Sequence, residues 1–249
     1  MGVQPRPGRP SLTPTPLSNH FGEDRNYRTG TRDPATRADP GAGAWRSKPI
    51  TAAAVAQRTA VETVLGTMTN IFPGPNATRH MRHYLGNSGR PYQIDLENMI
   101  RRVPSAKRAM VAEFRQAQRF IETLPVGRHL FTSRTGESAY NFQGENADWF
   151  FAIGGYTYWG KGEVRIAPSM RGKRYEVDFT YCFYDRYNWD GDKSVVVGGV
   201  EITDQFMGEF HLQGLAREFD CVGSLTRTLA WDGNYGGPDE PTILARPGR

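Results

Sequence analysis

The feature that most constrains the fold is a strict two-residue alternation from Tyr175 to Phe183. Apolar residues occupy the odd positions and polar residues or Cys182 the even ones, which is the period of a strand with one buried face. Asp185 continues the odd series, so a carboxylate stands where a core residue is expected. Because a buried, uncompensated carboxylate is costly, we expect Asp185 to be hydrogen-bonded, paired with a cation, bound to metal or protonated. The alternative is that the strand ends or bulges and Asp185 faces solvent.

The residues after Asp185 combine aromatic rings with side-chain oxygens. They do not fit an EF-hand calcium loop, because the register that aligns the glycine places Arg186 and Val197 where acidic ligands are required. The Asp-Gly step is more typical of a hairpin turn, here between the aromatic strand and a strand over residues 194–200. No cofactor is required by this interpretation. The alternative is a divalent ion, Mg²⁺ or Ca²⁺, held by Asp185, Asp190 and Asp192.

His211 is the candidate partner of Asp185. It lies in a predicted helix over residues 204–219, at the border of the apolar stripe. A histidine in this position is either a hydrogen-bonded border residue or a general acid or base, and Arg217 or Glu218 would supply a charge partner. An Asp–His pair at the rim of an aromatic pocket suits hydrolysis. Three further residues are expected to shape that pocket: Tyr187, Asn188 and Trp189.

The chain before residue 126 has a helical period. Apolar residues recur at three-to-four spacing over 61–71 and again over 110–124, and prolines punctuate the segment. Asp95 is a plausible N-cap for a short helix over Leu96–Val103. We therefore expect three or four helices in residues 50–125, each with one apolar face.

The chain after Gly127 has the pattern of strands. Asp148–Trp159 is an almost continuous aromatic run, typical of a strand buried on both faces, and the Gly-Lys-Gly step at residues 160–162 predicts a hairpin turn. Thr226–Trp231 is a predicted final strand. The sequence thus indicates one α+β domain over residues 50–249, with N-terminal helices on a mainly antiparallel sheet. Its strand-rich part, residues 126–249, contains the candidate site.

Residues 1–49 have the composition of a disordered tail. They contain eight of the seventeen prolines and few large aliphatic residues. The tail is either a docking or export segment or a plain linker. The first half of the chain is basic and the second half acidic, so nucleic acid is an unlikely but open partner. No apolar run approaches 20 residues, which argues against a membrane span, and pairing of Cys182 with Cys221 is open.

A family resemblance lies between residues 145 and 231. It rests on these segments: Tyr184–Ser194, Ile202-Thr203-Asp204, His211, Gly214–Phe219 and Gly223-Ser224. In them the chain resembles the C-terminal region of uncharacterised bacterial secreted effectors and polymorphic toxins, which travel with contractile injection or related secretion systems.

A fainter similarity is to the colicin M type of lipid II phosphatase, whose Asp-x-Tyr-Asp motif is followed shortly by His-Arg. Asp185 and Tyr187 fit this motif. Asn188 replaces the second Asp, and His211 lies much further on and is followed by Leu212.

The effector resemblance implies an antibacterial toxin made in the cytoplasm without a Sec signal and exported by a dedicated secretion system. It gives residues 1–49 a role in loading onto the secretion apparatus and implies an immunity protein as a partner. The leading hypothesis is therefore a secreted, hydrolase-like toxin domain. The alternatives are a non-catalytic interaction protein that binds through its aromatic sheet or basic helices, and an effector that targets nucleic acid through the basic half.

Overall fold

The computed structural model describes residues 26–36, 39–67, 74–189, 194–197, 200–233 and 242–243. These residues form six helices: α1 (Ala52–Thr67), α2 (Pro75–Leu85), α3 (Leu96–Arg102), α4 (Pro104–Thr123), α5 (Ala147–Ala152) and α6 (Asp204–Leu212). They also form ten strands: β1 (Tyr27–Thr29), β2 (Tyr92–Gln93), β3 (Gly127–Ser133), β4 (Glu137–Tyr140), β5 (Gly155–Ser169), β6 (Gly172–Tyr187), β7 (Ser194–Val197), β8 (Val200–Thr203), β9 (Phe219–Asp232) and β10 (Thr242–Ile243).

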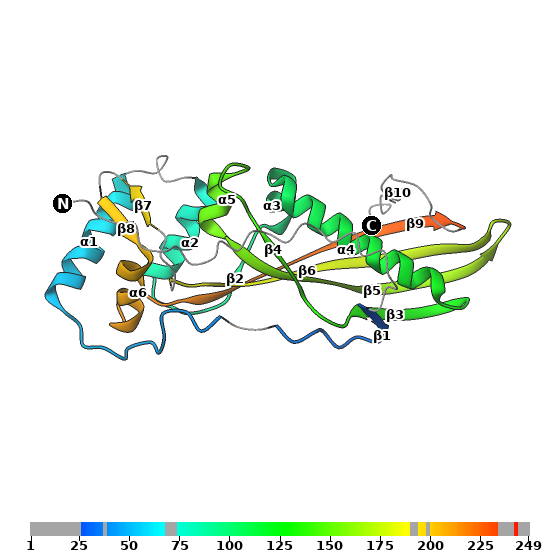
Figure 1. Cartoon of the computed structure of the whole chain (residues 1–249), viewed down its shortest axis with the longest axis horizontal. Helices are drawn as coiled ribbons and strands as arrows, with labels where there is room; N and C mark the ends of the chain where they lie inside the picture. The colour runs from blue at the N-terminus through cyan, green and yellow to red at the C-terminus, as the bar shows by residue number, and fades with distance from the viewer. Residues whose placement is uncertain are drawn as a thin grey trace, which may run out of the picture.

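Eight of the strands form one long, twisted sheet (Figure 1). Its order is β1-β3-β5-β6-β9-β10, with β4 beside β5 and β2 beside β9, and β7 and β8 form a separate hairpin. The β2–β9 pair is parallel and the other described pairs are antiparallel. The prediction of a mixed helix-and-strand fold with a mainly antiparallel sheet is therefore confirmed.

The alternation that starts at Tyr175 places one face of β6 in the core. The odd-numbered residues from Tyr175 to Phe183 are buried, and Tyr187 is buried as well. Helix α4 packs on this face, where Phe114 meets Phe179 edge-on with ring centroids 5.2 Å apart. The odd residues of β6 therefore define the helix-facing side of the sheet, and the even residues define the other side.

The helices are not all N-terminal, which corrects the expected order. β1 and β2 come before α1 and α3, and α5 and α6 lie among the later strands. The aromatic run Asp148–Trp159 is split, because its first part belongs to α5 and its second part to β5. Asn146 caps α5 by accepting a hydrogen bond from the backbone N–H of Trp149, and this local cap favours a helix over an extended strand.

The predicted Gly-Lys-Gly turn lies in the middle of β5, and the chain reverses at residues 170–171 between β5 and β6. The two glycines are needed for close contacts rather than for a turn. A Cβ on Gly160 would lie 2.0 Å from the Tyr27 hydroxyl, and one on Gly162 would lie 2.1 Å from the Asp178 carbonyl oxygen.

The region after β6 also differs from the expected hairpin. β6 pairs with β5 and β9, whereas β7 pairs with β8. The predicted Asp190-Gly191 turn lies outside the described residues. The helix expected over residues 204–219 ends at Leu212 as α6, and Phe219 already begins β9.

Residues 26–36 and 39–49 have a described structure, although the sequence predicted a disordered tail over residues 1–49. Tyr27 in β1 is buried, and its hydroxyl donates to the Glu113 carboxylate at 2.6 Å. Farther along, Asp33 accepts hydrogen bonds from Trp159 and Lys161 on the side of the sheet away from α4. Figure 1 shows this segment running along the sheet from β1 toward α1. Residues 1–25 lie outside the described part of the chain.

Candidate functional site

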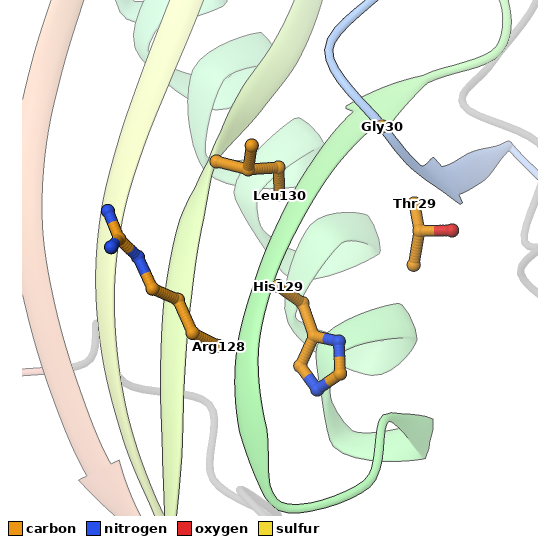
Figure 2. A pocket seen from close by; sticks show the side chains of 5 residues that line it. All are labelled: Thr29, Gly30, Arg128, His129 and Leu130. Carbon is orange, nitrogen blue, oxygen red and sulfur yellow. The ribbon is translucent and has the colours of Figure 1, made fainter.

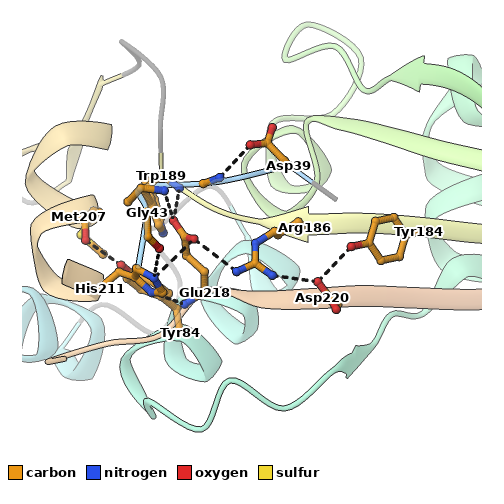
Figure 3. A network of polar contacts seen from close by, with 12 residues as sticks. Asp39, Gly43, Tyr84, Tyr184, Arg186, Trp189, Met207, His211, Glu218 and Asp220 are labelled. Carbon is orange, nitrogen blue, oxygen red and sulfur yellow. Dashed lines mark hydrogen bonds and ion pairs between the residues drawn. The ribbon is translucent and has the colours of Figure 1, made fainter. Parts of the chain in front are cut away.

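The candidate site lies where β6 ends, β9 begins and α6 turns back toward the sheet (Figure 3). Thr203 starts α6 by accepting a hydrogen bond from the backbone N–H of Phe206. Gly214, with φ of 72°, follows the end of the helix, a backbone conformation that favours glycine. The turn returns the chain to the sheet, so Glu218, the residue before β9, meets His211 in the last turn of α6.

Glu218 is the centre of this site. Its side chain is 0% exposed, and its Oε1 accepts hydrogen bonds from the backbone N–H groups of Ala42 at 2.9 Å and Trp189 at 3.2 Å. Its Oε2 lies 3.7 Å from the Arg186 guanidinium and 3.9 Å from His211 Nε2. Within the described residues Oε2 has no hydrogen bond. The donors and the cation offset the cost of burying the charge, and one oxygen is left available for chemistry.

The contacts of His211 define its tautomer. Its Nδ1 accepts a hydrogen bond from the backbone N–H of Glu218 at 3.1 Å. The proton of the neutral ring therefore lies on Nε2, which donates to the carbonyl oxygen of Gly43 at 3.0 Å. The His211 side chain is 3% exposed. His211 is thus positioned as a hydrogen-bond donor to a carbonyl group.

Arg186 connects Glu218 to a second acidic group on the same side of the sheet. Its guanidinium lies 3.2 Å from Asp220, which is directly opposite it in the β6–β9 register and also accepts from the Tyr184 hydroxyl at 3.1 Å. Burial, and then the Asp220 charge, raise the pKa of Tyr184 to about 12. Arg186 is 25% exposed, so it gives the site a cation that solvent reaches.

Residues 39–48, here called the strap, cross over Glu218 and His211. Besides the contacts of Ala42 and Gly43, the strap forms backbone hydrogen bonds from Arg46 to the His211 carbonyl and from Lys48 to the Leu212 carbonyl. Trp45 stacks under the guanidinium of Arg217, whose Cζ lies 4.4 Å from the ring centroid. The strap therefore closes the site through both backbone and side-chain contacts.

The structure brings several of the predicted site residues together. His211, Glu218 and the backbone of Trp189 are in direct contact. Tyr187 is buried beside them and stacks on Phe219 with centroids 5.0 Å apart. Asn188 is partly buried, and Arg217 lies on the strap side against Trp45.

Asp185 occupies the helix-facing side of β6, next to Arg186 on the other side. It is partly buried and faces Cys221 in the register. Burial, followed by the Asp185 charge, raises the pKa of the Cys221 thiol, which places the carboxylate close to that sulfur. The Glu218 carboxylate lies 3.9 Å from His211 Nε2, and the Asp185–His211 pair stays a prediction.

Sequence reasoning gave no role to Arg186, Asp220 or Tyr184. Arg186 lies in the same segment as Tyr187, Asn188 and Trp189. Its role depends on the β6–β9 register, which places Asp220 opposite it. The strap was missed because its contacts join residues more than 160 positions apart, as between Ala42 and Glu218. Glu218 itself was recognised only as a possible charge partner.

A metal site finds no support among the described residues, where no three His, Cys, Asp or Glu side chains are grouped to hold an ion. Asp190 and Asp192 lie outside that part of the chain, so their proposed role with Asp185 stays a prediction. Cys182 and Cys221 are both buried free thiols. None of the helices in the described segments has the length and apolar character needed to cross a membrane.

A shallow hollow elsewhere on the surface is not a comparable site (Figure 2). It has a volume of about 570 Å³ and is lined by β1 and β3 residues and the adjacent Gly30. Its one guanidinium, that of Arg128, is held by both carboxylate oxygens of Glu163 at 2.5 and 2.6 Å. His129 bonds to the carbonyl oxygen of Pro125. The charged groups of the hollow are therefore engaged within the protein.

No protein-family model and no curated protein matches the chain. A solved structure that matches is PaeM, a colicin M-like bacteriocin produced by Pseudomonas aeruginosa, with 11% sequence identity and a TM-score of 0.35. The match covers 64% of this chain and 52% of the bacteriocin, so this chain spans about half of that protein's length. At this TM-score the likeness establishes neither a shared fold nor a shared activity.

Proposed function

We propose that this chain is a toxin-type bacterial effector with hydrolase activity and that Glu218, His211 and Arg186 form its catalytic centre. The observation that carries the proposal is the Glu218 carboxylate, which is fully buried beside a cation and an imidazole and leaves Oε2 without a hydrogen bond in the described structure. A buried polar atom without a hydrogen bond is rare in folded proteins, and a catalytic role is one of its physical explanations.

The geometry assigns a distinct role to each side chain. Glu218 acts as the general base that takes a proton from an attacking water. His211 presents an Nε2–H donor to the oxygen that gains negative charge, and Arg186 adds a positive charge nearby. The proton held by Glu218 then passes to the leaving group. His211 transfers no proton in this scheme and acts only as a hydrogen-bond donor through Nε2.

Asp185 is the second candidate carboxylate. It lies on the opposite side of β6 from Arg186, so a catalytic role for Asp185 would require a centre on the helix-facing side, near Cys221 and Tyr187. Separate substitution of the two carboxylates distinguishes these locations.

Expression in a bacterial host, directed to the cytoplasm or the periplasm, tests the proposal. We expect the unaltered chain to arrest growth and Glu218→Gln to abolish arrest, because loss of a general base lowers a rate by about 10²- to 10⁴-fold. Glu97→Gln is the matched control, since Glu97 is an exposed partner of Arg227 away from the site, and it should arrest growth like the unaltered chain. Circular dichroism checks that each variant is folded.

Two outcomes would count against this assignment. Equal arrest by the unaltered chain and Glu218→Gln would remove Glu218 from the chemistry, and loss of arrest in Asp185→Asn alone would move the centre to the other side of β6. A complete lack of toxicity, including in the strap variants described below, would refute the toxin proposal itself.

A further inference from the structure

The strap enters the site through very small residues in a turn-containing backbone, in which Gly41 and Gly43 have φ of 61° and 121°. Its sequence from residue 41 is Gly-Ala-Gly-Ala. The backbone N–H of Ala42 donates to Glu218 Oε1 at 2.9 Å, and the carbonyl oxygen of Gly43 accepts from His211 Nε2 at 3.0 Å. His211 therefore polarises the carbonyl of the Gly43–Ala44 peptide bond. Glu218, the proposed general base, lies beside it.

The fit around this segment excludes larger side chains. A Cβ on Gly41 would lie 2.1 Å from Glu218 Oε2, so glycine alone fits there. On the facing helix, a Cβ on Gly208 would lie 3.1 Å from the Ala42 Cβ and 2.8 Å from the Trp189 carbonyl oxygen. The site is therefore shaped for a glycine followed by a residue with at most a small side chain.

Contacts beyond the small residues hold the segment in register. The backbone of Arg46 bonds to the His211 carbonyl at 3.3 Å, and that of Lys48 bonds to the Leu212 carbonyl at 2.8 Å. The Arg217 guanidinium stacks on the Trp45 indole, and the indole N–H donates to the amide oxygen of Asn87. Within the strap, the Ser47 N–H bonds to the Ala44 carbonyl at 3.2 Å, so these contacts hold a turn in place over the site.

We propose that the strap is a built-in pseudosubstrate and that the site hydrolyses peptides of small residues that adopt the same turn-containing backbone, at the bond corresponding to Gly43–Ala44. This inference rests on the proposed hydrolase function. Water attacks the carbonyl carbon, Glu218 accepts the water proton, the C–N bond breaks, and the amine leaves with that proton. Gly43 and Ala44 are exposed to solvent on the outer side of the strap. The strap is not cut while it is bound, because the Glu218 carboxylate is 0% exposed and so has no water from which to take a proton.

Gly41→Ala is the variant that should release the strap, because the new Cβ collides with the Glu218 carboxylate and Gly41 has φ of 61°. Gly30→Ala is its matched control. Gly30 also has positive φ, at 124°, but a Cβ there meets nothing within 4 Å. Hydrogen exchange of residues 39–48 measures release. Trp45→Ala, which removes the stack on Arg217, is a second releasing variant if Gly41→Ala does not fold.

The probe for activity is a synthetic peptide with the sequence of residues 39–48, analysed by mass spectrometry after incubation with each purified full-length variant. We expect Gly41→Ala to cut it between the second glycine and the following alanine at least about tenfold faster than the unaltered chain or Gly30→Ala, equivalent to about 1.4 kcal/mol. Adding Glu218→Gln should abolish cleavage. A peptide carrying Gly41→Val should resist cleavage, because it cannot enter beside Glu218.

The possible failures are distinguishable. A released strap with no peptide cleavage, together with growth arrest that depends on Glu218, would overturn the pseudosubstrate and leave the hydrolase proposal standing. A released strap with neither cleavage nor Glu218-dependent arrest would overturn both. Unchanged hydrogen exchange in both Gly41→Ala and Trp45→Ala would show that the strap is a permanent part of the fold and would also overturn the pseudosubstrate.

Discussion

Glu218 and Glu113 are both buried glutamates, but their surroundings differ in charge. Glu218 is held by two backbone N–H groups and by the Arg186 cation. Glu113 is held on Oε1 by neutral donors: the hydroxyls of Tyr27 and Ser133 and the backbone N–H of Gly160. Burial among neutral groups raises the pKa of Glu113 and favours its protonated form. The two residues therefore suit different purposes, one chemical and one structural.

Glu113 gives a prediction for the pH dependence of stability. Burial raises its pKa above the ordinary value of 4.5, and nearby Glu137 acts in the same direction. Its contribution to the free energy of unfolding is therefore present at low pH and is lost as pH rises through the folded-state pKa. Relative to Glu113→Gln, the unaltered chain should lose stability from about pH 4 to about pH 7. Urea unfolding of both proteins across this range measures the difference in their free energies of unfolding.

The prediction would be contradicted if that difference stayed constant with pH. It would also be contradicted if the unaltered chain became more stable relative to Glu113→Gln as pH rises.

The central strand β6 shows how much of an element the sequence determines. The alternation from Tyr175 predicts its buried face, and the structure confirms that face as far as Tyr187. The pattern does not reveal the partner strands, because pairing depends on distant segments. β9 supplies Asp220 opposite Arg186 from more than thirty residues away. The inward position of Asp185 was predictable, whereas the Arg186 network required the register.

Gly160 shows why the β5 prediction differed from the structure. A glycine next to a lysine and a second glycine resembles a turn when only neighbouring residues are considered. In the sheet, Gly160 leaves room for the Tyr27 hydroxyl and donates its N–H to Glu113. Glycine is needed at this position because of contacts with β1 and α4, which are remote in sequence. The helix α5 was likewise missed, because aromatic residues favour strands and the Asn146 cap was not recognised.

The segment before the strap gives an element-scale prediction. Cys182 lies on the even side of β6 opposite Trp159, and Asp33 binds both Trp159 and Lys161 there. Burial raises the pKa of the Cys182 thiol to about 11. We expect Asp33→Ala to loosen this cover and speed maleimide labelling of Cys182 several-fold, with Cys221, on the helix-facing side, unchanged as the internal control. Mass spectrometry resolves the two sites. Equal acceleration at both cysteines would indicate general unfolding instead.

At the scale of the whole molecule, α3 and α4 lie on one side of the sheet, α1 and α6 lie at one end, and the N-terminal segment after β1 runs along the other side (Figure 1). The segment starts in β1, passes Asp33 and ends in the strap over Glu218 and His211. Chemistry-bearing residues thus come from the end of β6, the end of α6 and the start of β9, and their cover comes from the other end of the chain. This arrangement couples access to the site with the placement of the N-terminal segment.

The sequence predicts the members of the site better than their arrangement. His211 was identified from its position at the border of an apolar helix stripe, Glu218 as a charge partner farther along the predicted helix, and Trp189 from the aromatic segment. Their contacts depend on the turn at Gly214 and on a strap that meets Glu218 from 176 residues away. Neither local propensity nor periodicity contains such long-range information, because both describe neighbouring residues only.

The most direct test of the central claim is growth of a bacterial host that expresses full-length Gly41→Ala, with and without Glu218→Gln. A site that is covered by the strap and depends on Glu218 predicts stronger growth arrest by Gly41→Ala than by the unaltered chain. It also predicts no arrest by the double variant at equal protein levels. Equal arrest by Gly41→Ala and by the double variant would contradict the account.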